Sequence, residues 1–148
     1  MIPTRAIQEQ MFDLLGADTT TFGAASKPRI SLVQAPFTPG TNLTPADYDV
    51  ATFDGYAPIP TATAPVTSID PVTGDVKLRV NATLLLTWIT TGATNLPQTI
   101  AGYVVEKSDG SVVYWSALLP SGPITLTAIG QSIEIPIPEI ELPLGAIS

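Results

Sequence analysis

The stretch IAGYVVEKSDGSVVYWSAL, residues 100–118, decides the fold of this chain. Its two ends, residues 100–106 and 112–118, are rich in Val, Tyr and other residues that favour strands, and its middle is polar. An Asp-Gly pair between two such runs, here Asp109-Gly110, is a strong signal for a tight turn. Residues 100–118 therefore predict an antiparallel β-hairpin.

The chain on either side of the hairpin continues the strand pattern. Upstream, residues 76–89 first alternate apolar and polar side chains and then become apolar on both faces, which predicts one long strand or two strands with a bulge. Downstream, a short strand is expected over 124–128. The last strand starts at Ile133, and Pro136 and Pro138 remove N–H donors from one of its edges. We expect this to be an edge strand that is protected against further pairing.

The first half of the chain is less regular. Residues 1–17 carry apolar side chains at the spacing of one helical face, which predicts a short amphipathic helix. These apolar residues are Ile7, Met11, Leu14 and Leu15. A helix of this length is marginal alone, so its apolar face must dock on its own domain or on a neighbouring subunit. A strand is expected over 29–35. A long Pro-rich loop follows over 36–75, where the prolines make a central sheet strand implausible.

Together these elements predict a mainly β protein with a single domain over residues 1–148. The domain combines the helix over 1–17, the irregular loop region over 36–75 and an antiparallel β core over 76–142. Strands that are apolar on both faces need cover on both sides. A β-sandwich or a barrel-like sheet supplies that cover and is the expected architecture.

The composition excludes several kinds of chemistry. The 148 residues include no His, no Cys and only six Lys and Arg, and the formal net charge is −7. Without imidazole or thiol, no Ser-His, Cys-His or zinc-thiolate site can form. The few cations argue against nucleic acid and against an anionic membrane as partners. We expect no catalytic residues, no cofactor and no metal, no membrane span, and a chain that begins near Met1 without a secretory signal.

Carboxylates remain the main source of possible chemistry. Asp47, Asp49 and Asp54 lie around Tyr48 and Tyr56, an arrangement that could bind a sugar or polarise a glycosidic bond. The simpler interpretation is that these carboxylates are solvated residues of turns, with Asp54 making an Asx-type turn before a glycine.

Two other binding sites are conceivable. Asp70 and Asp75, or the carboxylates just named, offer oxygen ligands for calcium, but the spacing of an EF-hand loop is absent. Tyr103, Tyr114 and Trp115 fall on neighbouring strands of the predicted hairpin and could form an aromatic binding platform. Packing in a core or between subunits is the simpler interpretation of these three aromatic residues.

The segment ATFDGYA, residues 51–57, and several short stretches between residues 100 and 135 together resemble small structural proteins encoded by tailed bacteriophages. The first segment is similar to an acidic-Phe-x-Gly-Tyr motif of that group. The other stretches are Ile100–Val105, Asp109-Gly110, Pro123–Leu126 and Ile133–Ile135. The resemblance implies a virion component, of the capsid-decoration or tail-associated type, and it transfers no catalytic residue.

The expected function is therefore that of a non-enzymatic virion structural protein, located in the virion and assembling on a repeating viral surface. Its expected partners are further copies of itself, with a trimer as one option, and a major capsid or tail protein. The candidate interaction residues are Phe53, Asp54, Gly55, Tyr56, Ile7 and Met11.

Two rival functions stay open at this point. A carbohydrate-binding or adhesin module would use Tyr48, Asp49, Asp54 and Tyr56, or the aromatic residues of the hairpin. A carboxylate-only hydrolase would need two acids about 5–10 Å apart in a cleft.

Overall fold

The computed structural model describes residues 28–60 and 85–136 in full, together with the backbone of the short strands at 2–3, 66–69, 76–79 and 139–142. Within this part of the chain the protein is mainly β and its strands pair antiparallel, as the sequence predicts. Residues 2–3 form a strand, and the rest of the predicted N-terminal helix, including Ile7 and Met11, lies outside the described residues.

The described strands are two to nine residues long and lie in three sheets. They are β1 (Ile2–Pro3), β2 (Arg29–Gln34), β3 (Ile59–Pro60), β4 (Val66–Ile69), β5 (Val76–Arg79), β6 (Leu86–Ile89), β7 (Gln98–Glu106), β8 (Val113–Leu118), β9 (Ile124–Leu126), β10 (Ser132–Ile135) and β11 (Glu139–Leu142).

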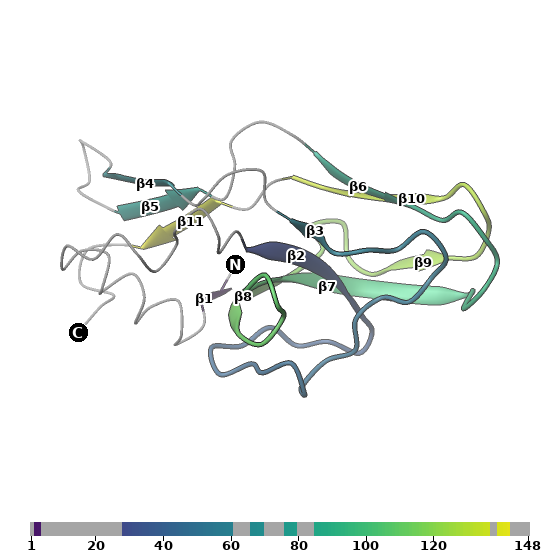
Figure 1. Ribbon diagram of the computed structural model, residues 1–148, viewed down its shortest axis with the longest axis horizontal. Helices are drawn as coiled ribbons and strands as arrows, with labels where there is room; N and C mark the ends of the chain where they lie inside the picture. Colours follow the sequence, from purple (N-terminus) through teal and green to yellow (C-terminus); the bar gives the residue numbers. More distant parts are fainter. Residues whose placement is uncertain are drawn as a thin grey trace.

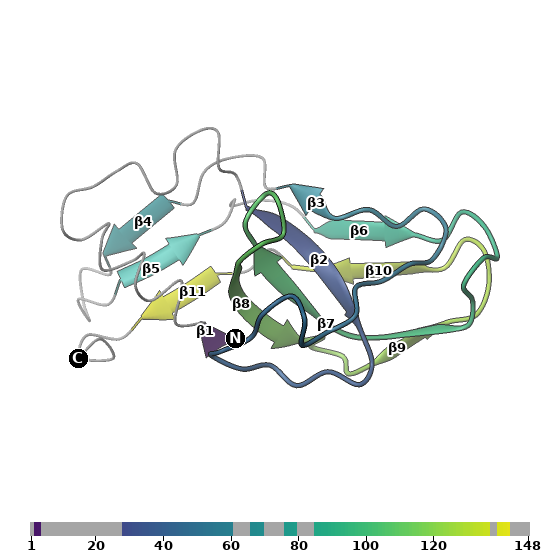
Figure 2. The same ribbon diagram turned by 60° about the horizontal axis from the view of Figure 1, so that its bottom comes forward.

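The largest sheet has the order β1-β8-β7-β2-β3, and β9 pairs with the first part of β7. A separate pair joins β6 to β10, with Ile89 opposite Ser132 and Leu86 opposite Ile135. A third sheet, of order β11-β5-β4, lies at one end of the molecule (Figures 1 and 2).

The predicted hairpin is confirmed as β7 and β8. Its turn is closed by hydrogen bonds from Gly110 N to the Lys107 carbonyl and from Lys107 N to the Val112 carbonyl, both 2.8 Å. Gly110 adopts φ +76°, a left-handed conformation that glycine reaches without strain. Ser111 N also donates to the Asp109 carboxylate at 2.9 Å, so the Asp-Gly pair supplies both the conformation and the bond that the turn needs.

The main hydrophobic core lies between the large sheet and the β6–β10 pair. Strands of both contribute side chains that are at most 3 % exposed, among them Leu32, Trp115, Trp88 and Ile133. The Trp88 indole donates to the Ala57 carbonyl at 2.8 Å, whereas Trp115 Nε1 has no hydrogen-bond partner among the described residues. Ile133 and Ile135 point inward while Ser132, Glu134 and Pro136 are exposed, which confirms the alternation read from the last strand.

The opposite face of the large sheet is covered by a segment that forms no strand. Residues 36–50, called the strap from here on, lie across β2 and β7 on the side away from β6 and β10 (Figure 1). A second, smaller hydrophobic cluster forms beneath the strap, and its members are Val33, Val104, Val113, Phe37, Leu43 and Tyr48. Strand β7 is therefore buried on both faces, which explains its unbroken apolar run.

Three elements differ from the sequence-based expectation. Residues 76–89 hold two strands that belong to different sheets, because β5 pairs with β4 and β11 whereas β6 pairs with β10. The loop region 36–75 contains β3 and β4, both at sheet edges, where a missing proline donor is tolerated.

The last predicted strand is the third difference, because it divides into β10 and β11 in separate sheets. Both β10 and β11 lie at the edge of their sheets, as expected, but Pro136 follows the end of β10 directly and so ends that strand. Local alternation predicts that a segment is a strand, but it does not say which neighbour that strand will find.

Candidate functional site

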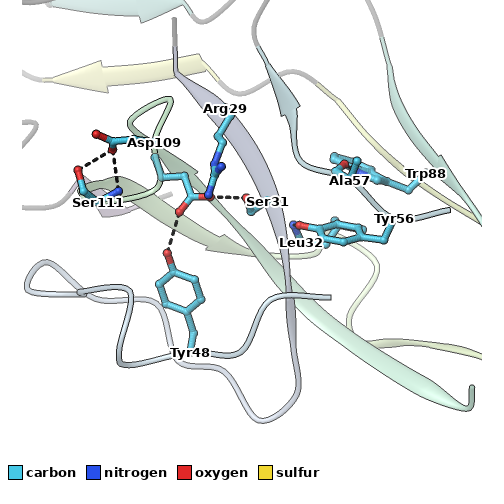
Figure 3. Close-up of polar contacts among 10 residues, drawn as sticks. Arg29, Ser31, Leu32, Tyr48, Tyr56, Ala57, Trp88, Asp109 and Ser111 are labelled. Carbon is cyan, nitrogen blue, oxygen red and sulfur yellow. Dashed lines mark hydrogen bonds and ion pairs between the residues drawn. The ribbon is translucent and has the colours of Figure 1, made fainter. Parts of the chain in front are cut away.

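The Phe53–Tyr56 segment, a candidate for partner binding, folds back into the protein's own core. Phe53 is only 2 % exposed and its ring meets the Tyr56 ring edge-on, with centroids 5.5 Å apart. The Tyr56 hydroxyl accepts a hydrogen bond from Leu32 N on β2 at 3.1 Å (Figure 3). The two aromatic residues thus fasten this segment to the core, with Phe53 buried and Tyr56 partly buried, while Gly55 is exposed and Asp54 is partly exposed.

Asp54 and Gly55 form the tight turn that lets both rings point inward. Tyr56 N donates to the Phe53 carbonyl at 3.0 Å, and Gly55 adopts φ +89°. A side chain at Gly55 would clash with the Ile89 carbonyl, and the Asp54 carboxylate accepts from Thr94 N at 3.2 Å. Asp54 is thus committed to holding the 53–56 turn against the loop after β6.

A second set of hydrogen bonds holds Thr52, the residue before this turn. The buried Gln98 side chain accepts from Thr52 N through Oε1 and donates to Thr52 Oγ1 through Nε2, both at 2.9 Å. Asn95 Nδ2 adds a bond to the Thr52 carbonyl at 2.8 Å. Residues 51–57 are therefore held along their length by bonds within the chain.

The most unusual polar feature is a carboxylate inside the protein. Glu106, at the end of β7, is 2 % exposed, and three side chains converge on it (Figure 3). Arg29 Nε donates to Oε1 at 2.9 Å, the Ser31 hydroxyl donates to the same oxygen, and the Tyr48 hydroxyl donates to Oε2 at 3.1 Å. A buried carboxylate is stable only when it is paired in this way.

The Glu106 cluster joins three parts of the chain that are distant in sequence. Arg29 and Ser31 come from β2, Glu106 from β7, and Tyr48 from the strap. Because Ser31 is fully buried, its hydroxyl is not open to a substrate. The Ser31–Glu106 bond joins β2 to β7, and the Tyr48–Glu106 bond holds the strap on them. Sequence reasoning missed this cluster, although a glutamate that directly follows the apolar run Tyr103–Val105 was a visible signal.

Burial also changes the pKa values of three tyrosines. Burial raises the pKa of Tyr48 well above its ordinary value, and the charge and hydrogen bond of Glu106 raise it further. Burial likewise raises the pKa of Tyr56 and Tyr103. All three phenols are therefore neutral donors or acceptors at neutral pH.

The acidic residues that the sequence singled out do not form a cluster among the described residues. Asp47 and Asp49 are exposed, and Asp54 is bound to the loop after β6. Asp47 Oδ2 accepts from Thr44 N and Thr44 Oγ1, both at 2.7 Å, and these bonds lower the pKa of the Asp47 carboxyl. In the residues that the structure describes, no group of three acidic side chains is placed to hold a metal ion, and Asp70 and Asp75 lie outside them.

The aromatic residues of the hairpin belong to the core. Tyr103, Tyr114 and Trp115 are 6 %, 2 % and 0 % exposed, so they do not form an open binding platform. Apolar side chains that do reach the surface lie elsewhere. They are Val50, Leu85, Ile89, Leu118 and Ile129.

Two of these exposed residues, Ile89 and Ile129, belong to segments that are hydrogen-bonded to each other. Ile89 ends β6, and Ile129 lies in the turn before β10, where Gly130 N donates to the Thr90 carbonyl and Thr90 N donates to the Gln131 carbonyl, both at 2.9 Å. The sequence indicated nothing about this arrangement, because a bond between residues 40 positions apart, Thr90 and Gly130, brings the two segments together.

The strap also encloses a hollow of about 580 Å³ on the surface. It is open to solvent and lies on the face of the protein opposite the β6–β10 pair. Its lining consists of Pro36, Phe37, Thr38, Pro39, Gly40, Thr41, Asn42, Leu43 and Asp47. Of the three acids that the sequence singled out, Asp47 alone lines this hollow.

Comparison with known proteins brings no relative: no family model matches the chain, and no curated protein or solved structure matches it significantly. Among the described residues, no helix has the length and apolar character needed to cross a bilayer.

Proposed function

We propose that this chain is a non-enzymatic structural protein of a tailed-phage virion, of the capsid-decoration type, which assembles with copies of itself on a repeating viral surface. The observation that carries the proposal is how the interior polar side chains are used. Glu106, Gln98 and Thr90 all bond to other parts of the same chain and hold its segments together.

A polar network of this kind suits a protein whose task is to keep its shape. Each buried group is costly unless it is paired, and a fully paired network makes one arrangement of the chain more stable than its alternatives. The strap, the 53–56 turn and the loop after β6 are all fastened in this way. A two-layer β-sandwich, made by the large sheet and the β6–β10 pair, is the architecture that we propose for this rigid body.

The surface supports assembly by shape rather than by charge. Ile89 is 50 % exposed, and Ile129, in the turn that is hydrogen-bonded to Thr90, is 61 % exposed. Exposed apolar side chains that form a patch are typical of contacts with another protein, and we infer such a patch at this end of the β6–β10 pair. A tail-associated position in the virion is the second option within the same proposal.

Electron microscopy of the particle encoded by the same genome tests the proposal. We expect density that fits this β fold at regularly repeated positions on the capsid. Co-sedimentation of purified protein with capsids that lack it should saturate at a fixed ratio per capsomer. Particles without any such density on the capsid or tail, together with no co-sedimentation, would contradict a virion role.

A further inference from the structure

The hollow of the strap is a built surface feature that the proposed structural role leaves unused. It measures about 580 Å³, which is within the range of small-ligand sites. Its lining is divided between apolar side chains and polar groups. The apolar ones are Pro36, Phe37, Pro39 and Leu43, and the polar ones are Thr38, Thr41, Asn42 and Asp47.

The walls of the hollow are fastened to the sheet beneath. Gly40 N donates to the Ser116 hydroxyl on β8 at 3.2 Å. The Phe37 ring lies on Gly102 of β7, where a side chain would come within 2.7 Å of the ring. Phe37 also meets the Tyr48 ring edge-on, with centroids 6.2 Å apart, and Tyr48 is held by Glu106.

These contacts order the strap before any ligand binds. A loop that is already ordered loses little conformational entropy when a ligand arrives, so more of the contact energy remains as affinity. The strap also contains three prolines, Pro36, Pro39 and Pro45, which restrict its backbone further. The buried Glu106 cluster therefore supports the hollow through Tyr48 and Phe37.

The chemistry of the lining selects the ligand class. No lysine or arginine is among the residues that line the hollow, so a phosphate or carboxylate ligand would find no countercharge. Asp47 is exposed, and its bonds to Thr44 lower the pKa of its carboxyl, which makes it an ionised acceptor for hydroxyl groups. Thr38, Thr41 and Asn42 are exposed and offer neutral donors and acceptors.

Phe37 supplies the apolar part of such a site. Its ring is partly exposed and forms part of the hollow's wall. An aromatic ring beside several hydroxyl, amide and carboxylate groups matches a molecule with one apolar face and many hydroxyl groups. Sugars have that character.

We propose that the hollow binds a neutral saccharide, which packs on the Phe37 ring and forms hydrogen bonds with Thr38, Thr41, Asn42 and Asp47. Of the acidic residues that the sequence suggested for sugar binding, Asp47 alone belongs to this site, since Asp54 and Tyr56 are bonded elsewhere in the chain. Its function would be contact with a glycan-bearing surface, in addition to the structural role.

Nuclear magnetic resonance titration tests this proposal on the full chain. The probes are glucose, galactose, mannose, N-acetylglucosamine and their disaccharides, each raised to the high millimolar range. We expect backbone amide shifts that concentrate in residues 37–43 and saturate with at least one probe. The absence of saturable shifts with every probe would overturn the proposal, as would shifts centred outside the strap.

Variants then locate the site. Thr41→Ala and Asn42→Ala change exposed side chains without touching the core, so both should fold normally. Each is expected to weaken binding about threefold to tenfold, the effect of one lost hydrogen bond. Thr87→Ala, an exposed threonine on β6, is the matched control and should leave the affinity unchanged. Equal affinity in all three variants would overturn the assignment, whereas capsid binding is measured separately and does not depend on it.

Discussion

At the scale of single residues, Glu106 is the most instructive position. It is the only buried acidic residue among those the structure describes, and its carboxylate is satisfied by Arg29, Ser31 and Tyr48. The Arg29 side chain is 32 % exposed, so its ion pair is partly screened by water. Removing one partner from a buried pair costs more than the pair itself contributes, because it leaves the others unsatisfied.

The Glu106→Gln variant should therefore be clearly destabilised. We expect the free energy of unfolding to fall by about 1–3 kcal/mol, because the amide cannot accept hydrogen bonds at both of its ends. Urea denaturation measures the change. Glu134→Gln, on the exposed face of β10, is the matched control and should alter stability by less than about 0.5 kcal/mol. A loss no larger than that of the control would show that the cluster does not stabilise the fold.

The raised pKa values of three buried or partly buried tyrosines predict how the stability of the protein changes at alkaline pH. The pKa values of Tyr48, Tyr56 and Tyr103 are raised by burial from an ordinary value of 10.0, so the folded state holds these protons more tightly than the unfolded state. This contribution to stability is fully present below pH 10.0 and is lost as the pH rises toward the raised values.

Urea unfolding at increasing alkaline pH, with phenolate absorbance recorded in parallel, measures that loss. We expect the free energy of unfolding to decrease above the ordinary tyrosine pKa, and phenolate absorbance to appear mainly on unfolding. Tyr48→Phe should lose less stability over the same interval, because one raised group is gone. Full phenolate absorbance in a protein that is still folded would contradict the burial of these residues.

At the scale of elements, the sequence predicted strands better than it predicted their partners. The β7–β8 hairpin followed from residues 100–118 because its turn chemistry and its pairing are both local. The separation of β5 from β6, and of β10 from β11, did not follow, because each strand of these pairs finds a partner far away in the sequence. The strap was expected only as an irregular loop, and its layer over β7 depends on contacts such as Phe37 on Gly102.

Gly102 should be essential for this layer. A methyl group there would clash with the Ala117 carbonyl and come within 2.7 Å of the Phe37 ring. We expect Gly102→Ala to lower the free energy of unfolding by about 1–3 kcal/mol, the usual cost of overpacking. Thermal and urea unfolding measure the effect.

Gly40→Ala is the matched control for that experiment. Its added methyl group would meet only the Leu43 side chain, at an ordinary distance of 4.0 Å, and its φ is not left-handed. We expect it to be neutral or to stabilise the protein by about 0.4–1 kcal/mol through the unfolded chain. Equal destabilisation by both substitutions would mean that the strap does not pack on β7 as described.

At the scale of the whole molecule, the exposed pair Ile89 and Ile129 is the basis for expecting self-assembly. Their two segments lie side by side because Thr90 bonds to the turn at 130–131. A surface of this kind becomes more stable when a second subunit covers it.

The double variant Ile89→Lys, Ile129→Lys should therefore shift the protein toward monomers. Light scattering coupled to size-exclusion chromatography measures the molar mass over a range of concentrations. Leu118→Lys changes an equally exposed apolar residue, 52 % against 50 % for Ile89, at a different place and should leave the assembly intact. A protein that is already monomeric at high concentration would contradict the proposed oligomer.

The sequence by itself determined the class of fold, the main hairpin, the alternation of Ile133 and Ile135, and the absence of imidazole and thiol chemistry. These properties depend on residue type and on neighbours close in the chain, which the sequence states directly. Only the tertiary structure decided which strands pair, that Phe53 and Tyr56 turn inward, and that Glu106 lies buried with Tyr48. Those outcomes depend on contacts between residues such as Tyr48 and Glu106, 58 positions apart, whose energy exists only once the chain has folded. The hairpin of residues 100–118 thus places Glu106 at the end of β7, and the fold alone gives that carboxylate its partners.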